Sequence, residues 1–160
     1  MWTTDFSRYV PVDLDLRRHE RPAVLGGLAL SALWSLQIPY RYHEALTSTR
    51  NWVRMGYDPA QTPLPLFSVL ADGGFDLFLI FIPAILLLGL THHQLHRHGS
   101  MSVYLMRRLP DRWEYLRRCW TVPLLGIAAA AALAALLAAM YSLIYIYCTP
   151  AAFLPPIYRK

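Results

Sequence analysis

The sequence is poor in charge, in cysteine and in catalytic motifs. Only 16% of its 160 residues are charged, and only two are cysteine. It contains neither a GxxxxGK[ST] loop nor a nucleophile elbow, which excludes nucleotide hydrolysis by a P-loop mechanism. It also lacks an HExxH helix, a paired CxxC and any recognisable basic DNA- or RNA-binding module. We therefore expect a chain that is not an enzyme by itself, needs no cofactor and does not bind nucleic acid.

Apolar residues dominate what is present. Hydrophobic residues make up 56% of the chain, whereas about 45–50% is typical of a soluble domain. They concentrate in three runs, at residues 22–40, 75–91 and 121–147. The first run reaches roughly across a 30 Å hydrocarbon core at about 1.5 Å per helical residue. The sequence predicts an all-α integral membrane protein, with residues 1–160 forming a single membrane domain of three transmembrane helices.

The segment before the first run has mixed charge and several aromatic residues. Trp2, Phe6 and Tyr9 can lie in the headgroup layer while the charged side chains face water, so we predict an N-terminal interfacial segment. A frayed terminus is the alternative. The first apolar run is long enough to remain as a spanning helix, and we expect no cleavable signal peptide.

The basic residues are distributed unevenly among the segments between the spans. Four precede the first span and six lie in residues 92–120, whereas residues 41–74 hold three and the tail holds two. Because positive residues favour the cytoplasm, we predict a multi-pass protein of the plasma membrane. Its N-terminus and the loop at 92–120 are cytoplasmic, and the loop at 41–74 and the C-terminus are extracytoplasmic. Cys119 and Cys148 lie at opposite ends of the third span, about 40 Å apart at helical rise, so no intrachain disulfide is expected.

Small residues recur every fourth position on the first and third spans. Gly27, Ser31 and Ser35 share one helical face, and the third span repeats alanine in the same way, for example at Ala131 and Ala135. Such faces allow helices to approach closely, which predicts partner helices from other transmembrane chains or from a second copy. A substrate-lining role for the serines is the alternative, although small, weakly polar residues in membrane helices usually mark packing.

Two groups of titratable residues could bind a cation. His92 and His96 share a helical face at metal-ligand spacing, but no third ligand lies nearby. Favourable contact with the dipole at a helix C-terminus is the simpler interpretation of the histidines. Asp72 and Asp76 could bind a cation or an amine, but a solvated helix start is the commoner explanation. The glycine pair between them indicates a break in the helix. Whether the histidine group binds metal stays open; it consists of His92, His93, His96 and His98.

The loop between the second and third spans carries a family resemblance. It reads SVYLMRRLPDRWEYLRRCWTVP, with Pro110 ending one helical turn and Asp111 able to cap the next. This pattern resembles the cytoplasmic loop between the second and third spans of ATP-binding-cassette (ABC) exporter permeases. The resemblance implies that the turn before Pro110 is a coupling helix that contacts a separate nucleotide-binding ATPase subunit. The implied partner-binding residues are Val103, Tyr104, Leu105, Met106, Arg107, Arg108, Leu109 and Pro110.

The resemblance leads to an expectation for function. Permeases of this family usually have six spans, whereas this chain has three predicted spans, so it would be a half-length membrane subunit completed by other chains. We expect a non-catalytic transmembrane subunit of an ATP-driven export complex, surrounded by membrane lipid. A structural or accessory subunit of another multi-chain membrane complex, whose loop lies on the headgroups, is the alternative.

Overall fold

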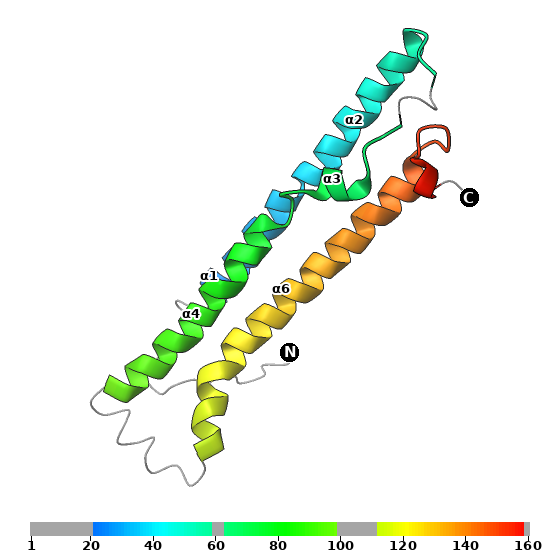
Figure 1. Cartoon of the computed structure of the whole chain (residues 1–160). Coiled ribbons are helices and arrows are strands. Elements are labelled where there is room, and N and C mark those ends of the chain that lie inside the picture. Colours follow the sequence, from blue (N-terminus) through cyan, green and yellow to red (C-terminus); the bar gives the residue numbers. More distant parts are fainter. Residues whose placement is uncertain (1–20, 59–62, 99–111, 159–160) are drawn as a thin grey trace, which may run out of the picture. The chain divides into compact units, whose positions relative to one another are not determined.

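All regular structure in the described part of the chain is helical. A computed structural model describes residues 21–58, 63–98 and 112–158, drawn as coloured ribbon in Figure 1. The elements are α1 (Arg21–Ser35), α2 (Gln37–Arg54), α3 (Phe67–Ala71), α4 (Asp76–His98), α6 (Arg112–Cys148) and the 3₁₀ turn η3 (Pro156–Tyr158). The all-α prediction is confirmed for these residues. The predicted N-terminal interfacial segment lies almost wholly outside them.

The helices divide between two compact units. One unit contains Met1–Ala29 and Phe78–Ala132, and the other contains Leu30–Leu77 and Leu133–Lys160. Helices α1, α4 and α6 contribute residues to both units, whereas α2, α3 and η3 belong to the second unit alone.

Two helical stretches have the length and composition to cross a membrane. They are Arg21–Arg54, which joins α1 to α2, and Trp120–Cys148 of α6. They include the first and third predicted spans. Only 17% of the most apolar window of each stretch is buried within the described chain, whereas the core helix of a soluble protein is mostly buried. Asp76–Thr91 of α4 is apolar but shorter.

A proline separates α1 from α2 without ending the helical path. Pro39 lacks the N–H that would bond to the carbonyl of Ser35, and its ring crowds that carbonyl. Leu36 keeps right-handed helical angles, φ −64° and ψ −13°, and its N–H bonds to the Leu33 carbonyl three residues back at 3.1 Å. The two helices therefore form one bent path.

The prediction that residues 41–74 form a loop is wrong for its first part, which belongs to helix α2. Residues 41–54 are helical rather than irregular. The helix forms because an inward face recurs at Ile38, Tyr42, Ala45 and Thr49, which is the 4-3-4 spacing of an amphipathic helix. Ile38 and Thr49 are buried, whereas most of the polar residues between them are exposed. Because those polar residues interrupt the apolar sequence, a prediction based on long apolar runs does not identify the helix.

The turn between α3 and α4 depends on its two glycines. Gly73 has φ +71°, a left-handed conformation that favours glycine. A Cβ on Gly74 would lie 2.5 Å from the Ile38 side chain, so only glycine permits this approach. The predicted break between Asp72 and Asp76 is confirmed, because α3 ends at Ala71 and α4 begins at Asp76. Asp76 occupies the first turn of α4, where a negative charge suits the helix dipole.

The small-residue face predicted on the first span is a packing face within the chain. In the first unit, the Phe81 ring of α4 occupies the space beside Gly27. In the second unit, Ser31 and Ser35 are 2% and 0% exposed. This outcome supports the packing interpretation over the substrate-lining one.

Replacing Gly27 with alanine should therefore destabilise the chain. A Cβ at this position would lie 2.1 Å from the Phe81 ring, and overpacking of this kind costs about 1–3 kcal/mol. We expect a lower melting temperature of the purified protein in detergent. The adjacent Gly26→Ala is a matched control, because nothing lies within 4 Å of its added methyl group. Equal melting temperatures for the two variants would contradict the packing of Phe81 on Gly27.

Candidate functional site

An aromatic cluster forms the core of the second unit. Its buried residues are Leu70, Tyr145 and Leu154, contributed by α3, α6 and the tail. The Tyr145 ring contacts three other rings, those of Tyr42, Phe67 and Tyr158, with centroid distances of 6.0, 5.9 and 5.8 Å. These distances are typical of favourable edge-to-face and tilted ring pairs. The cluster therefore joins α2, α3, α6 and the tail around one side chain.

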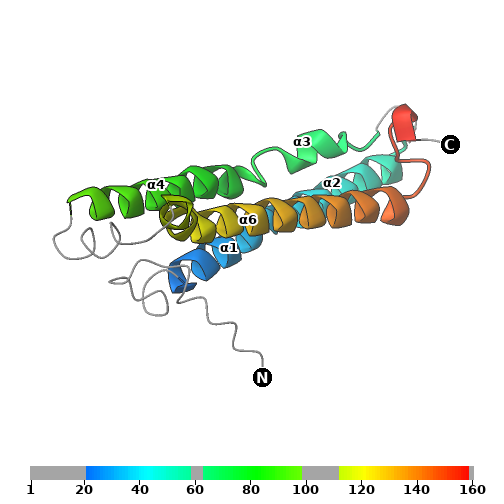
Figure 2. The ribbon, with the colours of Figure 1, turned by 90° about the horizontal axis from the view of Figure 1, so that it is seen from below.

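Hydrogen bonds close the cluster at its polar edge. The Tyr145 hydroxyl donates to the Pro65 carbonyl at 2.8 Å, and the Tyr42 and Thr149 hydroxyls lie 3.1 Å apart. The Leu64 N–H donates to the Phe153 carbonyl at 2.9 Å. The tail after α6 is thus folded back beside the segment that leads into α3 (Figure 2).

A second buried bond lies between α1 and α6 within the same unit. The Ser35 hydroxyl donates to the Ala32 carbonyl at 2.7 Å. Its single proton is then in use, so the Tyr141 hydroxyl, 3.1 Å away, donates to Ser35 Oγ. Ser35 is 0% exposed and Tyr141 is 6% exposed. Each of these polar groups is paired, as burial requires.

Three side chains that span the α1–α2 bend hold the α3–α4 turn. The Trp34 indole N–H and the Gln37 amide both donate to the Gly73 carbonyl, at 3.1 and 3.0 Å. The Arg41 guanidinium donates to the Asp72 carbonyl at 2.5 Å and to Gln37 Oε1 at 3.2 Å. Donors from both sides of the bend therefore share one turn, which fixes the start of α2 against it.

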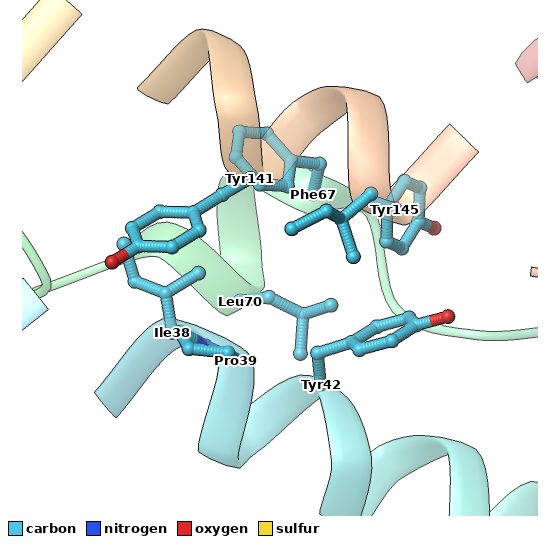
Figure 3. A pocket seen from close by; sticks show the side chains of 8 residues that line it. Ile38, Pro39, Tyr42, Phe67, Leu70, Tyr141 and Tyr145 are labelled. Carbon is cyan, nitrogen blue, oxygen red and sulfur yellow. The ribbon is translucent and has the colours of Figure 1, made fainter. Parts of the chain in front are cut away.

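An apolar slot lies between α2, α3 and α6 beside the cluster. It encloses about 250 Å³ including its open mouth. In Figure 3 the hydroxyls of Tyr42, Tyr141 and Tyr145 point away from its centre, where Leu70 lies. Its walls contain no carboxylate, histidine or cysteine side chain. The lining residues are Ile38, Pro39, Tyr42, Phe67, Leu70, Tyr141, Ile144 and Tyr145.

The predicted partner-binding turn falls outside the described residues. This holds for all eight positions from Val103 to Pro110. The four neighbouring histidines belong to α4 by their backbone, and His92 and His96 are four residues apart on that helix; their side chains are outside the description. Among the described side chains, no group of three or more histidine, cysteine or acidic residues could hold a metal ion.

Both cysteines lie on α6, as the predicted third span requires. Cys119 lies near the start of the helix and Cys148 is its last residue, so helical rise alone separates them by about 40 Å. Cys148 is exposed and free.

Comparison with known proteins adds no relative. No protein-family model, no curated protein and no solved structure matches the chain.

One feature of the sequence could have predicted part of the aromatic cluster, although the search for long apolar runs did not detect it. The inward face of α2 from Ile38 to Thr49 predicts an amphipathic helix, and such a helix needs an apolar surface to cover it. The tail contacts had no comparable signal, because the bond between the Leu64 N–H and the Phe153 carbonyl joins backbone groups of two segments that are distant in the sequence.

Loss of the Tyr145 hydroxyl should destabilise the protein modestly, and loss of the ring should destabilise it strongly. Tyr145→Phe removes the hydroxyl that donates to the Pro65 carbonyl, at a cost of about 0.5–1.5 kcal/mol. Tyr145→Ala also removes a side chain that is 2% exposed, at a cost of about 3–5 kcal/mol. Thermal unfolding in detergent measures both. Tyr147, 81% exposed on the same helix, is the control, and its Phe and Ala variants should unfold like the unsubstituted protein. Equal effects at the two positions would contradict the cluster.

Proposed function

We propose that this chain is a non-catalytic, multi-pass membrane subunit that works within a larger assembly. The observation that carries the proposal is the exposed apolar surface of the two helical stretches that are long enough to span. On α6, Ala130 is 0% exposed, whereas Ala131, Ala135 and Ala139 on the neighbouring surface are exposed. In a membrane this surface meets lipid or another helix, and small residues favour a helix.

We include α4 as a third span in this proposal. Its apolar part is short, but the whole helix has 23 residues and extends about 35 Å at helical rise. That length covers a hydrocarbon core of about 30 Å with the terminal histidines at the interface. With three spans, the distribution of basic residues favours the N-terminus and residues 92–120 on the cytoplasmic side of the plasma membrane and the C-terminus on the other side.

We propose more specifically that the assembly is an ABC-type exporter. Its support is the sequence of the cytoplasmic loop, in which the turn before Pro110 resembles a coupling helix. ATP-driven closure of a separate ATPase would move this turn and tilt the helices continuous with the loop. The separate ATPase would supply the energy, because the sequence of this chain contains no P-loop.

An accessory subunit of a different membrane complex is the second candidate. The exposed alanines of α6 favour it as much as they favour a permease, because either assignment requires partner helices. The two candidates differ in whether an ATPase is bound.

The native cysteines test the orientation directly. In intact cells, a membrane-impermeant maleimide should label Cys148, which is exposed at the extracytoplasmic end of α6. It should label Cys119 only after the membrane is permeabilised. Cys148→Ser and Cys119→Ser identify which thiol reacts. Labelling of Cys119 first would reverse the orientation, and labelling of both in intact cells would contradict the α6 span.

Purification in mild detergent from the native membrane, followed by mass spectrometry, tests the ABC assignment. A P-loop ATPase should copurify in a fixed ratio. Arg107→Glu and Arg108→Glu, combined with Tyr104→Pro, should then uncouple ATP hydrolysis from transport, because they reverse the charge of the contact and break its helical turn. Arg97→Glu, elsewhere in the same cytoplasmic segment, should leave coupling intact. Recovery of other membrane chains without an ATPase would favour the accessory subunit.

A further inference from the structure

One uncovered stripe runs along the path from α1 into α2. Its positions alternate by three and four residues, which keeps them on one side of a helix. Every member is exposed, including Leu33 at 63%, Leu36 at 53% and Tyr40 at 71%. The complete stripe consists of Leu33, Leu36, Tyr40, His43, Thr47, Arg50 and Arg54.

The chemistry of the stripe changes at Tyr40. Before it the exposed side chains are apolar, and after it they are polar or basic. An aromatic residue at such a change is typical of the boundary between hydrocarbon and headgroups. A seam for a partner helix would stay apolar along its whole length, which is not the case here.

The basic end of the stripe carries exposed positive charge, and no acidic side chain of α2 lies on the stripe. Arg50 and Arg54 are exposed, and the only acidic residue of α2, Glu44, lies off the stripe. Arg41, on another side of the same helix, differs because its guanidinium is engaged by the Asp72 carbonyl and by Gln37. The charge on the stripe is therefore available to an anion.

Distances along the helix place this charge near the membrane surface. At about 1.5 Å per residue, His43 lies about 5 Å beyond Tyr40, Arg50 about 15 Å and Arg54 about 21 Å beyond it. Headgroups occupy roughly 5–8 Å on each side of the hydrocarbon core. The field of anionic lipids extends about a further 8 Å at physiological ionic strength. Long arginine side chains can reach back toward the surface, and helix tilt lowers their height.

We propose that this stripe is a binding surface for anionic phospholipid headgroups, with Arg50 and Arg54 as the principal phosphate contacts. Leu33, Leu36 and Tyr40 face the acyl chains of the same lipids. The inference rests on the membrane-spanning part of the proposed function, and it is independent of coupling to an ATPase.

Native mass spectrometry of the full chain in detergent, titrated with phosphatidylglycerol or phosphatidylcholine, tests the proposal. Arg50→Gln with Arg54→Gln should weaken phosphatidylglycerol binding roughly fivefold for each arginine removed, since each basic residue near an anionic surface contributes about that factor. Phosphatidylcholine binding should not change. Arg41→Gln is the matched control and should retain the binding of the unsubstituted protein. Circular dichroism checks that the helix content is preserved in all variants.

Three outcomes would overturn the proposal. They are unchanged phosphatidylglycerol binding in the double variant, an equal loss for Arg41→Gln, or loss of a copurifying protein with lipid binding intact. The last outcome would assign the stripe to a protein partner. Carbonate extraction of native membranes separates this failure from that of the membrane assignment: release of the chain refutes the span, whereas retention with unselective lipid binding refutes only the stripe.

Discussion

Buried tyrosine hydroxyls must be hydrogen-bonded, and this requirement determines how the second unit is closed. Tyr141 and Tyr145 are 6% and 2% exposed, on successive turns of α6. Leaving either hydroxyl unpaired in an apolar setting would cost several times the net value of the bond that it makes. Ser35 and the Pro65 carbonyl meet the requirement from two other parts of the chain. The end of α1 and the segment before α3 are thereby tied to one helix.

Polar side chains also support the bend between α1 and α2, close to Pro39. A proline in a helix leaves a carbonyl without its usual donor and weakens the helix at that point. Trp34 on one side of the bend and Gln37 on the other both donate to Gly73, while Ser35 bonds back to its own helix. The direction of α2 is therefore set by contacts to the α3–α4 turn as well as by its own backbone. Those contacts need the close approach that Gly74 permits beside Ile38.

The sequence predicted the features that depend on composition and missed those that depend on single contacts. Long apolar runs identified α6 and the path beginning with α1, and the glycine pair identified the break before Asp76. Four-residue spacing correctly marked Gly27 and Ser35 as packing positions. Helix α2 was missed because its stability comes from one covered face, and a mean over all its residues dilutes that signal. The cluster around Tyr145 was missed because two of the rings that meet there, those of Tyr42 and Phe67, are far from Tyr145 in the sequence.

The two proposed binding regions would act at opposite membrane surfaces, which separates them physically. The stripe follows the proposed outward end of the first span, whereas the proposed coupling turn belongs to the segment between α4 and α6. Basic residues serve different purposes at the two places. In the loop they help to fix the orientation by their number, six against three in residues 41–74. On α2 only two arginines share the stripe, too few to reverse that bias, but their position beyond an exposed apolar face suits them to hold lipid phosphates. Lipid contact at one surface would then hold α2 in place, while the ATPase would move the coupling turn at the other surface.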